Sequence, residues 1–279
     1  MEIKGWKYYN HAIIPVCAPH EHADIKMLSN KEIWKLGGHA FLARWTSDFD
    51  CGYETNWWYV IKDTPFEVGQ LKAKRRYEIT KGKKNFEVER INPHQYMKEM
   101  FEIAFAVFKT YPLKYRPSID EQTFCRTVEE AKNIIAYAAF DKERKMCAYA
   151  WVEMHHSYAE LCVLKADINS EKYGVNAAML ACILEDFEER LKEPEFYICD
   201  GARNILHETS FQDYLEKYFG FRRAYCILHI RYRFLFGLII KMLYPFRSMI
   251  RGKGKIAGKI SAVLKMEEIR KSTWDKERM

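Results

Sequence analysis

The stretch that decides the fold ends a strand, turns through a polar loop and opens a long helix: Glu160-Leu-Cys-Val-Leu-Lys-Ala-Asp-Ile-Asn-Ser-Glu-Lys-Tyr-Gly-Val175. Its first part belongs to a predicted strand, Ser157–Ala166, and its end opens an amphipathic helix, Val175–Leu191. The first amides of a helix lack intrahelical acceptors and carry partial positive charge, and a glycine lets a ligand approach the backbone closely. The turn therefore predicts an anion site, to which Lys172 would add charge.

Strands and helices alternate on both sides of this turn. A hairpin and a third strand precede it, and a strand, a helix and a long strand follow it. The predicted elements are strands Ile134–Phe140 and Lys145–Met154, strand Glu195–Cys199, helix Ser210–Tyr218 and strand Arg222–Tyr232. Upstream, apolar spacing predicts a helix that starts near Pro93 and ends at Tyr111-Pro112, and a further helix from Asp120 to about Lys132. This order favours a mixed α/β (α+β) fold with a central, mostly antiparallel sheet flanked by helices.

The first 92 residues are rich in aromatic side chains and carry short strands. Ala40–Trp45 and Trp57–Ile61 are the clearest of these strands. A basic segment within Phe66–Asn85 reads as a helix that leads into a strand, Phe86–Ile91. Its basic run, residues 72–84, is interpreted as a solvated helix face, with contact to a glycan or a phosphate as the less favoured alternative.

Composition indicates a folded globular protein. The 279 residues are 48% hydrophobic and 30% charged, with 15% aromatic. Eight cysteines are scattered without a Cys-x-x-Cys pair, which favours buried, reduced thiols in the cytoplasm. The start, Met1–Trp6, has no apolar signal core, so secretion is not expected.

The loop and the elements after it resemble the acyl-CoA-binding half of the GNAT acyltransferases. In that superfamily a pyrophosphate loop, Arg/Gln-x-x-Gly-x-Gly/Ala, joins the fourth strand to the third helix and holds coenzyme A. With Gly174 as the central glycine, Glu171 stands at the Arg/Gln position and Asn176 at the last position. The run Tyr214–Tyr225 resembles the fourth helix of the family with its terminal Gly-Phe, here Gly220-Phe221.

The resemblance implies a site for acetyl-CoA or another acyl-CoA. Strand residues before the loop would pair with the pantetheine arm, and a backbone N–H there would meet the thioester oxygen as it becomes an oxyanion. The residues implied in cofactor binding are Val163, Leu164, Lys165, Lys172, Tyr173, Gly174, Val175, Asn176, Ala177 and Asn204. For Val163, Leu164 and Lys165 the alternative is that they belong to an ordinary central strand without a role in cofactor binding.

The resemblance also implies an acid that protonates the leaving thiolate. The family often uses a tyrosine shortly before Gly-Phe, and here Glu216 occupies that place, flanked by Tyr214 and Tyr218. These three residues are the catalytic candidates. Packing of the tyrosines and solvation of Glu216 is the favoured alternative.

Two residues after the fifth predicted strand, Asp200 and His207, are the candidates for binding the acceptor. His155-His156 reads as a solvated turn in preference to a base. Cys17-Ala-Pro-His-Glu-His22 reads as a polar loop in preference to a metal site, because further ligands at fitting spacing are missing. No metal is predicted.

A looser resemblance covers Trp57–Ile91, which is similar to the first half of Fem-type acyltransferases. In those proteins two GNAT-like halves pack together and only the second keeps the cofactor site. The resemblance implies a degenerate GNAT-like half at 1–92, an acyl-CoA-binding half at 93–233 and a separate tail at 234–279.

The tail concentrates the positive charge of the chain. Net charge is +7, but the segment from Lys217 to Met266 holds 12 lysines and arginines and no acidic residue, so the remainder carries 33 basic and 38 acidic groups. On a single helix its polar residues would gather on about a third of the circumference. This stripe comprises Arg233, Lys241, Arg247, Ser248, Arg251, Lys255 and Lys259. The pattern predicts an interfacial helix over 234–260 on anionic lipid, kinked at Pro245, with packing against the body or a partner subunit as the alternative.

Together these observations predict an acyltransferase that moves an acyl group, acetyl foremost, from coenzyme A to an amine or hydroxyl acceptor in envelope or exopolysaccharide assembly. The predicted location is the cytoplasm, at the inner membrane face. A GNAT-shaped binding module without catalysis is the alternative, and an aminoacyl-tRNA donor of Fem type is a variant. No nucleic-acid partner is predicted, because the chain lacks a known binding module.

Overall fold

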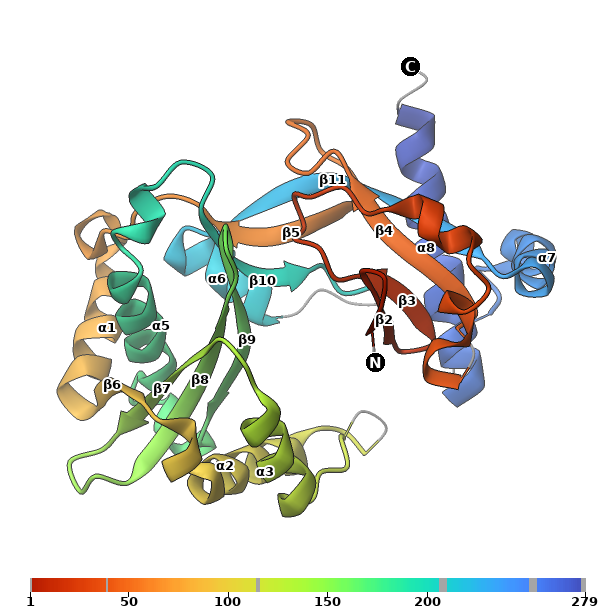
Figure 1. Ribbon diagram of the computed structural model, residues 1–279. Coiled ribbons are helices and arrows are strands. Elements are labelled where there is room, and N and C mark those ends of the chain that lie inside the picture. The colour runs from red at the N-terminus through yellow and green to blue at the C-terminus, as the bar shows by residue number, and fades with distance from the viewer. Residues whose placement is uncertain (1, 39, 114–115, 206–209, 251–254, 277–279) are drawn as a thin grey trace. The chain divides into compact units, whose positions relative to one another are not determined.

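The computed structural model describes residues 2–38, 40–113, 116–205, 210–250 and 255–276 (Figure 1). The chain divides into two compact units. Unit 1 comprises residues 1–60, 202–210 and 223–279, and unit 2 comprises residues 61–201 and 211–222. Each unit is built from separate stretches of chain, whereas the halves predicted at 1–92 and 93–233 are continuous. Those halves stay a prediction.

Unit 2 holds five strands of a mostly antiparallel sheet. In spatial order these are β10 (Tyr197–Ala202), β9 (Tyr158–Ala166), β8 (Met146–Met154), β7 (Ile134–Phe140) and β6 (Glu87–Ile91). Neighbours are antiparallel except β9 and β10, which are parallel. The mixed α/β fold with a mostly antiparallel sheet is therefore confirmed, and the strands begin and end within about three residues of the predicted bounds.

Helices cover both faces of this sheet. They are α1 (Ala73–Asn85), α2 (Met97–Thr110), α3 (Glu121–Glu130), α4 (Ile168–Glu171), α5 (Val175–Asp186) and α6 (Ser210–Phe219). Helices α2 and α3 share one hydrophobic core with Ala138 and Trp151 of the sheet. Because side chains alternate along a strand, Tyr137 points to the other face, where its hydroxyl donates to Asp186 of α5.

Unit 1 is formed from both ends of the chain. Its strands lie in the order β1 (Glu2–Ile3), β2 (Trp6–Tyr9), β3 (Ala12–Pro15), β4 (Leu42–Ser47), β11 (Arg222–Tyr232) and β5 (Trp57–Lys62). Trp6, Ile13 and Leu36 belong to one of its cores. Short 3-10 helices occur in both units: Ile25–Ser29, Ile33–Gly38, Val68–Gln70, Pro93–Gln95, Arg190–Lys192 and Tyr244–Phe246.

The tail forms two helices, and the prediction of one amphipathic helix over 234–260 is wrong. Helix α7 (Phe234–Leu243) ends in the 3-10 turn that contains Pro245, and α8 (Lys255–Lys276) begins after a gap in the described residues. Proline ends α7 because it has no amide hydrogen to donate and its ring clashes with the preceding turn. The predicted basic stripe therefore does not lie on one helix. Among the described residues, no helix is both long and apolar enough to cross a membrane.

Two glycines let α1 and α5 approach each other closely in unit 2. Gly174 has a φ of 89° and precedes α5. A Cβ added at Gly82 of α1 would lie 2.9 Å from the Cβ of Ala178 and closer still to the carbonyl oxygen of Gly174. A Cβ at Gly174 would lie 2.8 Å from the carbonyl oxygen of Glu78. The contact fixes α1 beside the first turn of α5.

Replacing Gly82 by alanine tests this contact. Alanine favours a helix over glycine by up to about 1 kcal/mol, but the added methyl group would have to displace backbone and overpack the contact, at a cost of about 1–3 kcal/mol. We expect Gly82→Ala to lower the melting temperature by several degrees. Gly258→Ala in α8 is the matched control, because a Cβ there meets no atom within 4 Å and should leave stability equal or higher. An equal gain from both substitutions would contradict the close approach.

Candidate functional site

Strands β9 and β10 run parallel but stay paired over only three residues. Tyr197–Cys199 pairs with Tyr158–Glu160, whereas β9 continues along β8 as far as Ala166. From Leu161 onward, β9 therefore has a backbone edge that β10 does not cover. The predicted cofactor-binding residues Val163–Lys165 lie on this edge.

A β-bulge interrupts β9 where the two strands part. Trp151 of β8 pairs with Val163 and Val152 pairs with Leu161, so Cys162 is the additional residue on β9. A bulge bends its strand and leaves the additional residue outside the ladder. After Glu160 the side of β9 that faces away from β8 has no strand partner among the described residues, so its backbone groups can bind a ligand. Such an amide is the type of donor that stabilises an oxyanion.

The turn after β9 delivers the chain to the first turn of α5. The amides of Val175, Asn176 and Ala177 come first in this helix and have no intrahelical acceptor. These N–H groups and the positive end of the helix dipole favour an anion. Lys172 and Tyr173 are exposed beside them. The structure thus brings the predicted loop residues together with the uncovered edge of β9.

Helix α1 supplies two further polar groups to this turn. Lys81 Nζ donates to the carbonyl oxygen of Lys172 at 2.9 Å, and Asn85 Nδ2 donates to that of Tyr173 at 3.4 Å. The sequence reading of 72–84 as a solvated face missed this contact. The signal was Gly82, because a glycine inside a helix often marks a close packing contact.

Asn176 carries a polar atom without a partner. Its side-chain Oδ1 is buried and has no hydrogen-bond donor among the described residues. A buried acceptor without a donor destabilises a protein by about 1–3 kcal/mol. A ligand that supplies an N–H or O–H group here would remove this cost.

Asp200 lies directly after Cys199, the last residue of β10 that pairs with β9. Burial raises the pKa of its carboxyl to about 7, the hydrogen bond with Gln212 lowers the pKa, and the negative charge of Glu160 raises it. A carboxyl that titrates near neutral pH suits proton transfer. This makes Asp200 a stronger candidate for the base than its position in the sequence indicated.

The two tyrosines of α6 pack around a buried arginine. Arg75 is 5% exposed, its Nη1 donates to Tyr214 Oη at 3.2 Å, and its guanidinium lies 3.6 Å from the centre of the Tyr218 ring. Burial raises the pKa of Tyr214 to about 12, whereas a hydrogen bond with Lys217 lowers the pKa of Tyr218. Glu216 lies two positions from each tyrosine and so on another side of α6. Of the two tyrosines, Tyr218 has the pKa better suited to an acid.

An open cavity of about 530 Å³ lies beside the bulge. It is lined by Thr127, Glu130, Ala131, Lys132, Ile134, Trp151, Glu153, Cys162 and Val163. Burial, with the charges of Glu160 and Glu153, raises the pKa of the Cys162 thiol to about 12. The thiol therefore stays protonated, which argues against a cysteine nucleophile in this cavity. The cavity offers room for an acceptor next to the uncovered strand.

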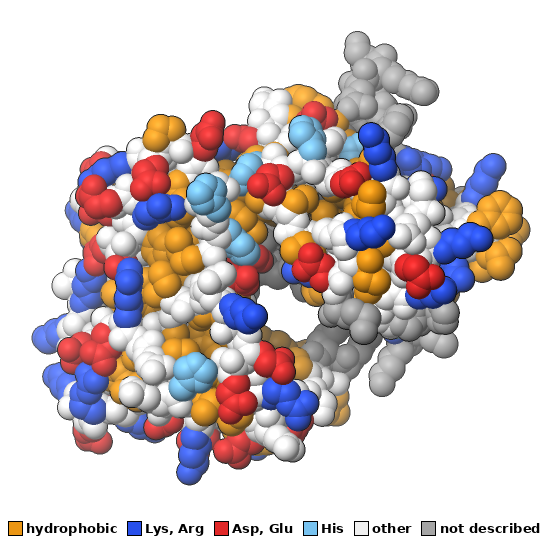
Figure 2. All heavy atoms as spheres, in the orientation of Figure 1, with side chains coloured by type: hydrophobic (Ala, Val, Ile, Leu, Met, Phe, Trp, Pro, Cys, Tyr) orange, Lys and Arg blue, Asp and Glu red, His pale blue; other side chains and the backbone are white. Residues whose placement is uncertain are grey.

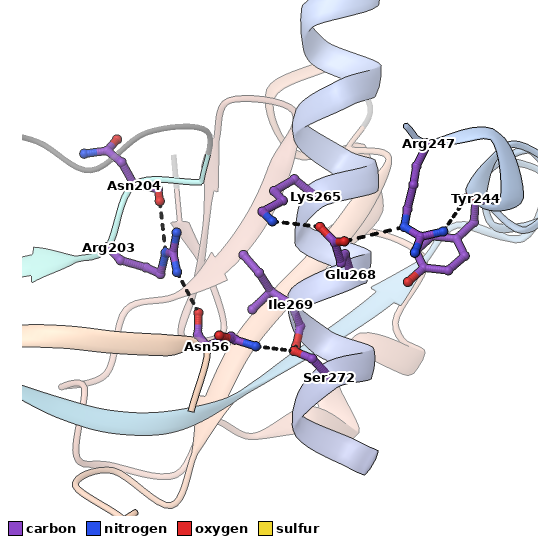
Figure 3. Close-up of polar contacts among 9 residues, drawn as sticks. All are labelled: Asn56, Arg203, Asn204, Tyr244, Arg247, Lys265, Glu268, Ile269 and Ser272. Atoms are coloured by element: carbon purple, nitrogen blue, oxygen red, sulfur yellow. Dashed lines mark hydrogen bonds and ion pairs between the residues drawn. The ribbon is translucent and has the colours of Figure 1, made fainter. Parts of the chain in front are cut away.

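The remaining predicted residues lie elsewhere or outside the described part. Lys165 Nζ approaches Tyr111 Oη at 3.4 Å and the Phe108 ring, so its side chain is directed to α2. Asn204 belongs to unit 1, where its carbonyl oxygen accepts from Arg203 Nε at 3.1 Å (Figure 3). His207 lies outside the described residues. No group of three side chains able to hold a metal ion occurs in the described part of the chain.

No family model matches the sequence, and no curated protein matches it. Solved structures do. The C-terminal domain (DUF2156) of a putative lysylphosphatidylglycerol synthetase from Agrobacterium fabrum matches with a TM-score of 0.51 and 11% identity over 85% of this chain and 82% of that one. L-PGS from Bacillus licheniformis matches with a TM-score of 0.49 and 11% identity over 94% of this chain and 84% of that one. FemX matches with a TM-score of 0.46 and 9% identity over 62% of this chain and 60% of that one.

GNAT acetyltransferases match a shorter part, as shown by one from Desulfovibrio desulfuricans with a TM-score of 0.31 and 14% identity over 38% of this chain and 67% of that one. At these identities the similarity concerns the fold. The predicted resemblance to GNAT and Fem-type proteins is confirmed at that level, and the Agrobacterium domain is one match with a TM-score above 0.5.

Substituting Asp200 tests the environment of its carboxyl. The pKa in the folded protein, about 7, lies above the ordinary 3.8, so the folded state favours the protonated form. The resulting destabilisation is absent below about pH 4 and complete above about pH 7. We expect Asp200→Asn to raise stability by roughly 1–3 kcal/mol at pH 8 and to change it little at pH 4. Thermal melts at both pH values measure this.

Asp213→Asn, at an exposed position on α6, is the control for the loss of one negative charge. It should give the same small change at both pH values. A gain for Asp200→Asn that is independent of pH would show that its carboxyl is not perturbed.

Proposed function

We propose that the protein is an acyltransferase that moves an acyl group, acetyl foremost, from coenzyme A to an amine or hydroxyl acceptor. The observation that carries this proposal is the continuity of β9 with α5. A strand edge that β10 leaves uncovered from Leu161, with a bulge at Cys162, is followed along the chain by the first amides of α5, Val175–Ala177, which have no acceptor within the helix. A donor with amide groups in a flexible arm and a diphosphate at its end matches both parts of this surface.

The residues present fit such a donor. The backbone of Val163–Lys165 would hold the pantetheine arm, and the first turn of α5 would hold the diphosphate. Lys172 lies beside that turn, and Lys81 bonds to the Lys172 carbonyl. Coenzyme A would supply the activated thioester.

Proton transfer would fall to groups of the chain itself. Asp200, with a pKa of about 7, would accept the proton of the attacking amine or hydroxyl, and a free amide near the bulge would stabilise the developing oxyanion. Tyr218, whose pKa is lowered, is the candidate acid for the leaving thiolate. Tyr214 serves to hold Arg75, because its hydroxyl is already engaged there.

The acceptor would enter the cavity beside the bulge. Its lining combines an indole, Trp151, with the carboxylates Glu130 and Glu153, a mixture that suits an amine or a sugar. The Agrobacterium domain is named for a synthetase of an aminoacylated lipid, and this supports an acceptor or product of the cell envelope. The same similarity keeps an aminoacyl-tRNA donor as the variant of this proposal.

Donor binding is tested with acetyl-CoA and free coenzyme A as the probes. A ligand at about 100 times its dissociation constant stabilises the folded state by about 2.7 kcal/mol, which should raise the melting temperature by about 5–10 °C. Lys172→Glu should reduce that shift by at least half, because it replaces a cation beside the diphosphate by an anion. Lys142→Glu in the β7–β8 turn is the control of equal charge change. The absence of any shift at several millimolar donor would rule the proposal out.

Turnover separates an enzyme from a binding module. Glucosamine, which offers an amine and hydroxyls, is the first probe acceptor, and the release of free thiol from acetyl-CoA is the measurement. Release that Asp200→Asn lowers by about a hundredfold supports catalysis. A thermal shift with an intact thioester in the presence of glucosamine, lysine and ethanolamine supports the module without catalysis.

A further inference from the structure

Helix α7 exposes an apolar face in unit 1. Seven of the 17 large hydrophobic side chains that are exposed in the described chain lie between Phe234 and Met249. Phe234 is 77% exposed, Leu235 72% and Met242 66%. Single exposed hydrophobic residues are common, but a concentration of this kind on one short segment marks an interaction surface. This surface, made by Phe234, Leu235, Leu238, Ile239, Met242, Phe246 and Met249, is the α7 face.

Unpaired positive charges border the α7 face. Arg231, Arg233 and Lys241 are exposed, and none has an ion-pair partner among the described residues. No Asp or Glu occurs from Lys217 to Met266, so nothing on the segment itself neutralises them. Figure 2 shows the hydrophobic side chains over α7 at the right edge, with basic side chains next to them. An apolar face with a cationic border is complementary to an interface in which an anionic outer layer covers an apolar interior.

The opposite side of α7 is anchored, so the exposed face is held in place. Phe236 packs on Phe41, with 5.2 Å between the ring centroids, and Ile240 is buried. After the Pro245 turn, Arg247 pairs with Glu268 of α8 at 3.6 Å (Figure 3). Helix α8 in turn packs Met266 and Ile269 into the cores of unit 1.

Figure 3 also shows how α8 is tied to strand β5. Asn56 Nδ2, just before β5, donates to Ser272 Oγ at 2.7 Å, and Arg203 Nη1 donates to the carbonyl oxygen of Asn56 at 3.1 Å. Lys265 pairs with Glu268 at 2.7 Å, so this charge of α8 is neutralised within the helix. The exposed hydrophobic side chains of the described tail therefore lie on α7 and the turn after it.

We propose that the α7 face docks on an anionic lipid bilayer, with α7 lying in the plane of the interface. Its apolar side chains enter the boundary between headgroups and acyl chains, and Arg231, Arg233 and Lys241 contact lipid phosphates. A second copy of the chain is a poorer occupant, because a symmetric contact through this face would bring the same unpaired cations together. The proposal does not depend on acyl transfer.

The test is flotation of the full chain with vesicles of phosphatidylcholine containing about 30% phosphatidylglycerol, compared with vesicles of phosphatidylcholine alone. Leu235→Gln with Leu238→Gln should weaken the partition by roughly a hundredfold, because each leucine loses most of its burial in the interface. Leu113→Gln is the control, since Leu113 is 83% exposed in unit 2 and should leave the partition unchanged.

Charge is tested separately. Arg233→Gln with Lys241→Gln should weaken binding to the anionic vesicles by about fivefold for each charge removed, and high salt should reduce wild-type binding in the same way. Lys142→Gln is the matched control. Equal flotation of the wild type and the double leucine variant would overturn the proposal. The proposal would also be overturned if the wild type bound neither kind of vesicle and instead sedimented as a dimer that the leucine substitutions convert to a monomer.

Discussion

The bulge at Cys162 is the constraint on which the organisation of unit 2 depends. Strand β9 has to pair with β8 up to Ala166, yet it pairs with β10 only through Glu160. The additional residue lets β9 bend away from its parallel neighbour without breaking the ladder to β8. A continuous sheet would have used every amide of β9 internally. The bend leaves the side of β9 that faces away from β8 without a strand partner in the stretch that leads to α5.

The electrostatic balance at the turn explains how an irregular loop can still favour an anion. Glu171 stands where related loops carry Arg or Gln, and its charge opposes a phosphate. Lys172 is exposed next to it, and Lys81 of α1 is held at the Lys172 carbonyl, so two cations face one carboxylate. The dipole of α5 adds about half a positive charge at Gly174. The summed charge at the turn is positive, although the loop motif alone indicated a lack of positive charge.

Local pattern predicted the elements of unit 2 well and their contacts poorly. Period-two stretches such as Ile134–Phe140 and the Gly220-Phe221 helix end are encoded in adjacent residues, so sequence alone locates them. The partnership of Gly82 with Gly174 joins residues 92 positions apart, and the sequence shows only that each glycine is unusual. The same holds for Arg75, whose burial against Tyr214 and Tyr218 turned two catalytic candidates into packing partners as well.

The tail shows why the positive charge counted along a sequence overstates the positive charge of the folded surface. A single helix over 234–260 would have combined all its cations in one stripe. In the folded chain, Arg247 and Lys265 pair with Glu268, and Arg270 pairs with Glu267, so two carboxylates of α8 offset several of the tail's cations. Helix α7 has no carboxylate within reach along the chain, and its hydrophobic side chains have nothing to cover them among the described residues of unit 1. The carboxylates of α8 thus neutralise cations on α8 and in the turn before it, whereas Arg231, Arg233 and Lys241 beside the exposed side chains of α7 have no ion-pair partner among the described residues.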